Sequence, residues 1–114
     1  MKIRLIVPHC VQPNGDRTNP VTVYGKAIAD IAGGFTASQA TGGWIDGDGE
    51  LIVEPVTVFD IVVAQEYIST NATSGQSSVG PAMRFHDLAK RIARELHQDC
   101  VYLEIDGHVE LVRQ

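Results

Sequence analysis

Apolar and polar positions in the first third of the chain follow a strand-like pattern and then a helix-like one. Residues 3–7 are mostly apolar and β-branched, which predicts a strand that ends near residues 8–11. Further along, apolar residues recur at three- and four-residue spacing, which predicts an amphipathic helix. Asn and Pro at 19–20 are typical of a helix start, and the two glycines at 33–34 of a helix end. The helical stripe consists of Tyr24, Ala27, Ile28 and Ile31.

The middle of the chain predicts two strands, residues 35–45 and 50–63, joined by a tight turn at the Asp-Gly-Asp-Gly of 46–49. The first of these strands is rich in Thr, Ser, Ala and Gly. The second has apolar residues at both odd and even positions, which is typical of a strand in the middle of a sheet with both faces covered. Pro55 interrupts this second strand and predicts a bulge or bend there.

The last third begins with a polar stretch at residues 69–80, which we expect to be a loop. Pro81 starts a second amphipathic helix. Residues 100–105 and 108–112 predict two short strands joined by the hairpin turn at 106–107. The core stripe of the second helix consists of Phe85, Leu88, Ala89, Ile92 and Leu96.

The predicted order is β-α-β-β-α-β plus a short C-terminal strand, which is the ferredoxin-like split β-α-β plan of the α+β class. In this plan the sheet is antiparallel, the first four strands have the order 4-1-3-2, and both helices lie on one face. We therefore expect a single domain over residues 1–114. The loop 11–20, the turn 46–49 and residues 97–100 should gather at one end of the sheet.

Composition agrees with one domain, since the 114 residues have a mass of 12.3 kDa and are 44% hydrophobic and 20% charged. The formal net charge of −5 argues against general nucleic-acid binding, which needs a basic surface. No apolar run approaches the ~20 residues of a membrane span, and the first residues do not resemble a signal peptide. These features predict a cytoplasmic protein with no membrane association.

Two cysteines could contribute to a metal site, because the predicted topology brings Cys10 close to Cys100. His97 is three residues before Cys100, and neutral imidazole and thiolate are common zinc ligands. Cysteine is also often buried simply as a small apolar side chain. Two unrelated cysteines are therefore the preferred interpretation, and we expect no metal and no cofactor. The acidic turn 46–50 lacks the ligand spacing of a calcium loop and is interpreted as a charged turn.

An anionic ligand could bind near the start of the second helix. Ser77 and Ser78 lie just before that helix, whose first turn offers free backbone N–H groups. Arg84 and Arg91 lie on the helix itself and would favour a small anionic, nucleotide-like ligand or an acidic partner. The simpler interpretations are a flexible connector and a solvated helix face.

Glu54 is the most distinctive carboxylate, because it lies in an otherwise apolar strand, where burial raises the pKa of a carboxyl group. Glu54 shares the even face of that strand with Asp60, unless a bulge at Pro55 changes the alternation. Tyr24, Trp44 and Tyr102 could line a shallow pocket beside Glu54 on a wet sheet face. His86 is a second candidate acid or base, although no nucleophile is paired with it.

The segment from residue 33 to 63 contains the pattern Gly-Gly-aromatic-Thr, then Gly-Trp, then Gly-x-Leu-x-x-Glu before a hydrophobic strand. The pattern consists of Gly33, Gly34, Phe35, Thr36, Gly43, Trp44, Gly49, Leu51 and Glu54. In this pattern the chain resembles small, largely uncharacterised proteins of phages, prophages and bacteria. The resemblance covers a little over a quarter of the chain and implies a ferredoxin-like fold and a phage or prophage origin. It transfers no catalytic residue.

The sequence leaves three functional hypotheses. The first is a small non-catalytic binding protein, phage-encoded and active against host defence in the host cytoplasm, which binds a small anionic ligand or a host protein. The second is a small enzyme in which Glu54 or His86 acts as general acid or base. The third is a structural homo-oligomer, in which another subunit covers the second face of strand 50–63. A dimer or a higher homo-oligomer is expected in any case.

Overall fold

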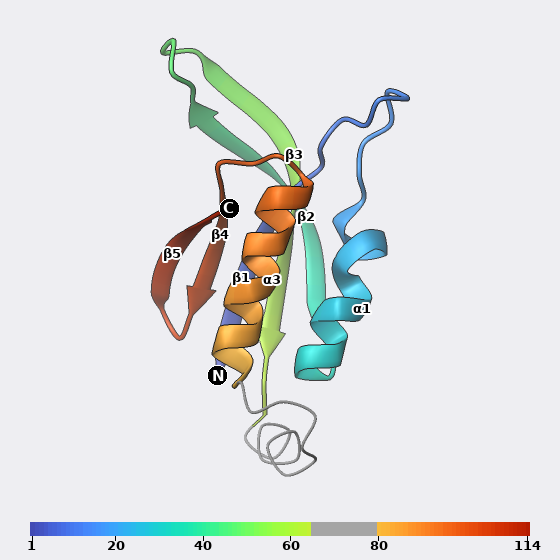
Figure 1. Cartoon of the computed structure of the whole chain (residues 1–114), viewed down its shortest axis with the longest axis vertical. Coiled ribbons are helices and arrows are strands. Elements are labelled where there is room, and N and C mark those ends of the chain that lie inside the picture. Colours follow the sequence, from blue (N-terminus) through green and yellow to red (C-terminus); the bar gives the residue numbers. More distant parts are fainter. Residues whose placement is uncertain (65–79) are drawn as a thin grey trace.

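The computed structural model describes residues 1–64 and 80–114 and shows a five-stranded sheet with two long helices (Figure 1). The elements follow one another in the predicted order, and the chain is an α+β protein with a ferredoxin-like fold. Their bounds are β1 (Lys2–Pro8), α1 (Pro20–Ala32), β2 (Thr36–Ile45), β3 (Leu51–Val62), α3 (Pro81–Glu95), β4 (Cys100–Ile105) and β5 (His108–Arg113).

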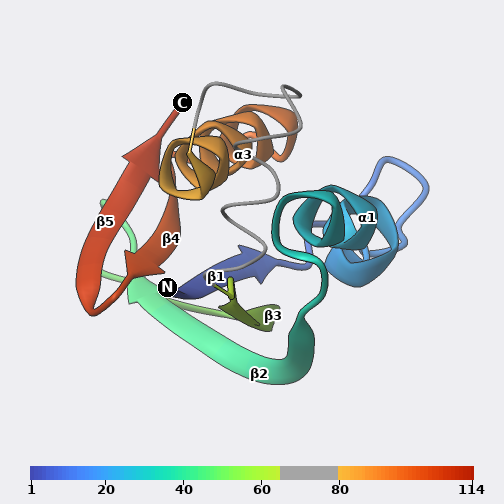
Figure 2. The same cartoon turned by 90° about the horizontal axis from the view of Figure 1, so that it is seen from below.

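The sheet has the strand order β2-β3-β1-β4-β5, and each neighbouring pair is antiparallel. The central strand is β1, in which Leu5 pairs with Phe59 of β3 on one side and with Leu103 of β4 on the other. Both helices lie on the same side of the sheet (Figure 2). The predicted order and the predicted one-sided placement of the helices are therefore confirmed.

The core lies between the sheet and the helices. Alternate residues of β1, at positions 3, 5 and 7, point toward the helices and are at most 2% exposed. The stripe of α3 meets them with Phe85 and Ile92, which are fully buried. On the same side of β3, Phe59 packs edge-on against Phe35 with ring centroids 5.3 Å apart. This one-sided core is what the two helical stripes predict.

Helix α1 has the ends that its sequence predicts. The side chain of Asn19 accepts a hydrogen bond from the backbone N–H of Val21 at 3.1 Å. At the other end, Gly33 adopts a left-handed conformation with φ of 92°, and its N–H donates to the carbonyl of Ala29. Both ends of α1 are therefore set by local hydrogen bonds of the residues that the sequence singles out.

The bulge predicted at Pro55 is absent. Pairing between β2 and β3 runs without interruption, and Thr41 pairs directly with Pro55. The carbonyl of Pro55 accepts a hydrogen bond from the N–H of His9, so this residue presents its backbone toward β1. Since β1 ends at Pro8, a proline without an N–H interrupts no ladder at this position. Glu54 and Asp60 therefore keep the same side of the strand, as expected.

The prediction that both faces of β3 are covered is only half right within one chain. Phe59 and Ile61, at odd positions, are buried under the helices, whereas Val62 on the other side is 67% exposed. No helix of the described chain crosses this second side of the sheet, here called the open face (Figure 2).

Strands β2 and β3 continue past the end of β1 as a two-stranded arm, seen at the top left of Figure 1. The arm contributes to an elongated shape of 49 × 29 × 23 Å. Large apolar side chains of the arm are exposed, namely Trp44, Ile45, Leu51 and Val53. In the part of the chain that the structure describes, no helix is long and apolar enough to cross a membrane.

Candidate functional site

Trp44 and Glu54 lie on the same face of the arm. In the register of β2 and β3, Trp44 pairs with Ile52 and Gly42 pairs with Glu54, so the ring and the carboxylate are diagonal neighbours. Position 42, opposite Glu54, needs a glycine, because a Cβ there would meet Val56 Cγ1 at 2.9 Å. We call Gly42, Trp44 and Glu54 the arm site.

The carboxylate of Glu54 is half-buried and has no hydrogen bond or ion pair with any residue that the structure describes. Burial raises the pKa of this carboxyl above its ordinary value, while the positive charge of Arg17 opposes the rise. A partly desolvated carboxylate with no partner among the described residues is available to accept a proton or to hold a polar ligand. Trp44, 42% exposed, provides a flat apolar surface next to it.

A second polar group lies where β1 ends, around the fully buried side chain of Thr57. The Thr57 hydroxyl is 2.7 Å from Nε2 of His9 and accepts a hydrogen bond from Nε2 of Gln39 at 3.2 Å. Arg17 in turn donates from Nη1 to the backbone carbonyl of His9 at 2.8 Å. This arrangement ties the loop after β1 to β3 and places the charge of Arg17 near Glu54.

The sequence analysis did not identify Thr57, Gln39 or Arg17 as functional positions. The one signal was a threonine among apolar residues of a central strand, where a buried hydroxyl needs a hydrogen-bond partner. Arg17 lies in the irregular loop, so no periodicity could predict its position.

Cys10 lies close to the residues that follow α3. Its sulfur accepts a hydrogen bond from Nε2 of Gln98 at 3.3 Å and is 3.9 Å from the carbonyl oxygen of Leu96. Burial raises the pKa of the Cys10 thiol, and the nearby charge of Glu54 raises it further. These conditions keep the thiol protonated and unreactive.

The weak metal candidates Cys10, His97 and Cys100 do not form a binding cluster. Both cysteines are free thiols. Within residues 1–64 and 80–114, no group of three or more His, Cys, Asp or Glu side chains could hold a metal ion. In the acidic turn, the Asp46 carboxylate accepts from the backbone N–H groups of Asp48 and Glu50, so it organises the turn.

The predicted pocket of Tyr24, Trp44, Glu54 and Tyr102 is not formed. Tyr24 is only 1% exposed because it belongs to the stripe of α1 that faces the sheet. Its hydroxyl donates to Oε1 of Glu95 at 2.9 Å, and the guanidinium of Arg91 lies over its ring at 5.8 Å. Burial and the bond to Glu95 raise the pKa of Tyr24.

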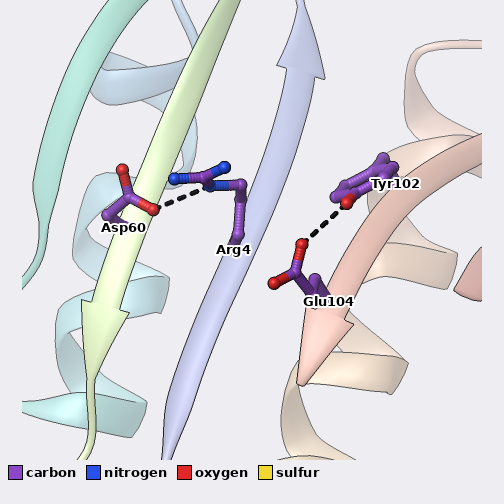
Figure 3. Close-up of polar contacts among 4 residues, drawn as sticks. All are labelled: Arg4, Asp60, Tyr102 and Glu104. Atoms are coloured by element: carbon purple, nitrogen blue, oxygen red, sulfur yellow. Dashed lines mark hydrogen bonds and ion pairs between the residues drawn. The ribbon is translucent and has the colours of Figure 1, made fainter. Parts of the chain in front are cut away.

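Tyr102 lies on the open face and is also separate from Trp44. Its hydroxyl donates to Oε1 of Glu104 at 2.7 Å (Figure 3). In the same view Nε of Arg4 reaches Oδ1 of Asp60 at 2.9 Å. Both residues of this ion pair are about half exposed, so its contribution to stability is small. Asp60 is therefore the ion-pair partner of Arg4 on the surface of the sheet.

His86, the second candidate acid or base, faces β5. Its Nε2 is 3.1 Å from Oε1 of Glu110, a partly exposed pair. No nucleophilic side chain of the described residues bonds to it. The geometry therefore favours Glu54 over His86 for chemistry.

Of the predicted ligand-binding residues, Ser77 and Ser78 lie outside the described residues. Arg84 and Arg91, both on α3, line a groove of about 380 Å³ between α1 and α3. The groove shares no residue with the arm site.

The fold of nearly the whole chain is similar to that of known structures. No family model and no curated protein matches the chain. The structure is similar to a phage SAM lyase in complex with S-methyl-5'-thioadenosine, with a TM-score of 0.67, 19% identity, and coverage of 99% of this chain and 88% of that chain. It is also similar to a phage SAM lyase in the apo state, with a TM-score of 0.57, 18% identity, and coverage of 96% and 82%. At these identities the likeness shows the fold.

Proposed function

We propose that this chain is a phage-type protein that binds S-adenosylmethionine (SAM) and the thioether S-methyl-5'-thioadenosine at the arm site, and that it cleaves the former into the latter. The observation that carries the proposal is the whole-length likeness to a phage SAM lyase that holds this thioether. It is supported by the aromatic ring and the unpartnered carboxylate that share one face of the arm.

The arm site suits a nucleoside thioether. The half-exposed ring of Trp44 can stack on adenine, an interaction worth about 1–3 kcal/mol per base. The Glu54 carboxylate can accept hydrogen bonds from the two ribose hydroxyls, which compensates the partial desolvation of the carboxylate. Gly42, which pairs with Glu54, adds no side chain to this face, and the Val56 side chain packs against its backbone.

Cleavage needs little from the protein, because the sulfonium of the substrate is a good leaving group. The carbon–sulfur bond to the amino-acid chain breaks, and sulfur takes the electron pair to become a neutral thioether. In one route the substrate's own carboxylate attacks that carbon and forms a lactone. In the other, a base removes a proton from the neighbouring carbon and an alkene forms. Glu54 would be a binding group in the first route and the general base in the second.

The first experiment incubates the purified chain with SAM and separates the products by liquid chromatography. Formation of S-methyl-5'-thioadenosine by the wild type, with a loss of about 100-fold in Glu54→Gln, supports the proposal. Glu50→Gln is the matched control, because Glu50 is an exposed acid of the same arm. Equal rates in all three proteins would show that Glu54 does not contribute to turnover and would remove the arm site from the proposal. The lactone and the alkene are isomers, so proton NMR distinguishes the two routes.

A non-catalytic binding role is the second candidate. It is favoured by the absence of any acid–base pair beside Glu54 in the part of the chain that the structure describes. Saturable binding of the thioether without turnover of SAM would support it. Both roles fit the phage or prophage origin that the resemblance of residues 33–63 implies. Cleavage of SAM also fits an anti-defence function in the host cytoplasm, since it would withhold a methyl donor from host enzymes.

Homo-oligomer formation also belongs to this proposal. A two-stranded arm is marginally stable by itself in water, yet here it exposes Ile45, Leu51 and Val53 on the face opposite the arm site. The open face adds exposed apolar side chains at Val62, Val109 and Leu111. Apolar surface of this extent is typical of an interface between subunits.

A further inference from the structure

The groove between α1 and α3 has a second set of charged and apolar side chains that the proposed function does not use. It encloses about 380 Å³, within the size range of small-molecule sites. Its apolar side chains are Ala27 and Ile31 of α1 and Leu88 of α3. Ile31 and Leu88 are almost fully buried, so the groove has a fixed apolar floor.

Charged side chains of both signs line the rim. On α3, Arg84 and Asp87 lie three residues apart, which places them on neighbouring positions of one helix face. Neither makes a hydrogen bond or an ion pair with any residue of the described ranges. Since neither charge has a partner within the described ranges, the i, i+3 spacing places an available cation beside an available anion.

The other charges of the rim are already engaged. Arg91 lies over the ring of Tyr24 and is 3.7 Å from Glu95. Asp30 on α1 is bonded to Lys26 at 2.9 Å and adds negative charge opposite Asp87. Among the rim residues that the structure describes, a ligand therefore meets one available cation, at Arg84, and a negative region formed by Asp87 and Asp30.

We propose that this groove binds the head group of a free α-amino acid with an apolar or thioether side chain. The ligand carboxylate pairs with the guanidinium of Arg84, which can bind it through two parallel hydrogen bonds. The ammonium group lies against Asp87 and Asp30, and the side chain lies on Ala27, Ile31 and Leu88. An anion without an ammonium group is disfavoured, because the two carboxylates would repel it.

This assignment is independent of the proposed function, since no groove residue belongs to the arm site. Its test uses the full chain, labelled with nitrogen-15, and L-methionine as the probe. Saturable shifts of the amide signals of Ala27 and Leu88 are expected. Two modified ligands separate the head-group contacts: N-acetyl-L-methionine lacks the ammonium charge, and L-methionine amide lacks the carboxylate. Each should bind at least about tenfold more weakly than L-methionine.

Variants test the same contacts from the protein side. Arg84→Gln and Asp87→Asn should each raise the Kd for L-methionine by about tenfold or more. Lys90→Gln is the matched control, because Lys90 is an exposed charge of α3 that does not line the groove, and it should leave the Kd unchanged. The absence of saturable shifts at about 10 mM L-methionine, or binding of either modified ligand as tightly as L-methionine, would overturn the assignment. The ligand comparison uses the wild type, so it decides even if a variant fails to fold.

Discussion

Trp44 and Glu54 are diagonal neighbours on one face of the β2–β3 arm, with Gly42 opposite the carboxylate. The half-exposed ring and the half-buried acid come from two strands whose register is continuous past Pro55. This relationship links a short sequence pattern to a surface that can hold a nucleoside, and three of the predictions below depend on it.

Replacing the carboxylate tests its contact with the ligand. Glu54→Gln keeps one acceptor and the shape of the side chain, so it should weaken binding of S-methyl-5'-thioadenosine by about tenfold. Glu54→Ala should weaken it further. Isothermal calorimetry measures both values, and Glu50→Gln on the same arm should bind like the wild type. Unchanged affinity in Glu54→Ala would remove this residue from the site.

The pH dependence of stability follows from the raised pKa of Glu54. The folded chain holds this proton to a higher pH than the unfolded chain, in which the pKa is roughly 4.3. Glu54 therefore contributes its full stabilisation below that value and loses it as the pH rises through the folded pKa. Urea unfolding of the wild type and Glu54→Gln at pH 4 and pH 7 should show the variant gaining stability relative to the wild type at the higher pH. If the difference in unfolding free energy between the variant and the wild type is the same at both pH values, or changes in the opposite direction, the pKa of Glu54 is not raised.

Trp44 should provide much of the affinity for the base. Trp44→Ala removes the stacking surface and should cost about 1–3 kcal/mol, or a factor of roughly 5 to 150 in Kd. Trp44→Phe keeps a smaller ring and should give an intermediate value. Calorimetry with the same thioether ranks the three proteins. An alanine variant that binds as tightly as the wild type would place the base elsewhere.

Thr57 should matter for stability through its hydrogen bonds. Thr57→Val preserves the shape but leaves His9 and Gln39 without their shared partner, at a cost of about 1–3 kcal/mol in the free energy of unfolding. Thr41→Val, an exposed threonine of β2, is the control and should change stability by less than about 0.5 kcal/mol. Similar midpoints in urea for both variants would show that the Thr57 bonds are dispensable.

The assembly state follows from the exposed apolar arm. Native mass spectrometry at micromolar protein should show a dimer or a higher oligomer. Leu51→Ser removes an apolar side chain that is 65% exposed and should shift the mass toward the monomer. Val23→Ser, at a comparably exposed apolar position of α1, should not. A monomeric wild type at this concentration would contradict the expected oligomer.

Much of the fold could be predicted from local chemistry. Asn19 and Gly33 mark the ends of α1 because a cap and a left-handed residue are local requirements. The prediction of a bulge at Pro55 was wrong. A proline disrupts a strand only where its missing N–H would have bonded to a neighbouring strand, and β1 has ended at this position. That information lies in the tertiary pairing and in no short segment of sequence.

The candidate site was predictable only in part. Glu54 and Trp44 were identified from a carboxylate in an apolar strand and from the resemblance, and the register places them together. The placement of Tyr24 in a pocket beside Glu54 was wrong. Tyr24 belongs to the apolar stripe of its helix, and that stripe correctly predicts burial against the sheet. Arg17 acts on Glu54 from an irregular loop, whose path no periodicity predicts.

The most direct test uses the fluorescence of Trp44, the one tryptophan in the sequence. S-methyl-5'-thioadenosine is titrated into the wild type and into Glu54→Gln while the emission is recorded. We predict a saturable change in the wild type and a midpoint about tenfold higher in the variant. An emission that does not change at about 1 mM ligand, with calorimetry showing no heat of binding, would contradict the arm site as the place where this protein binds its ligand.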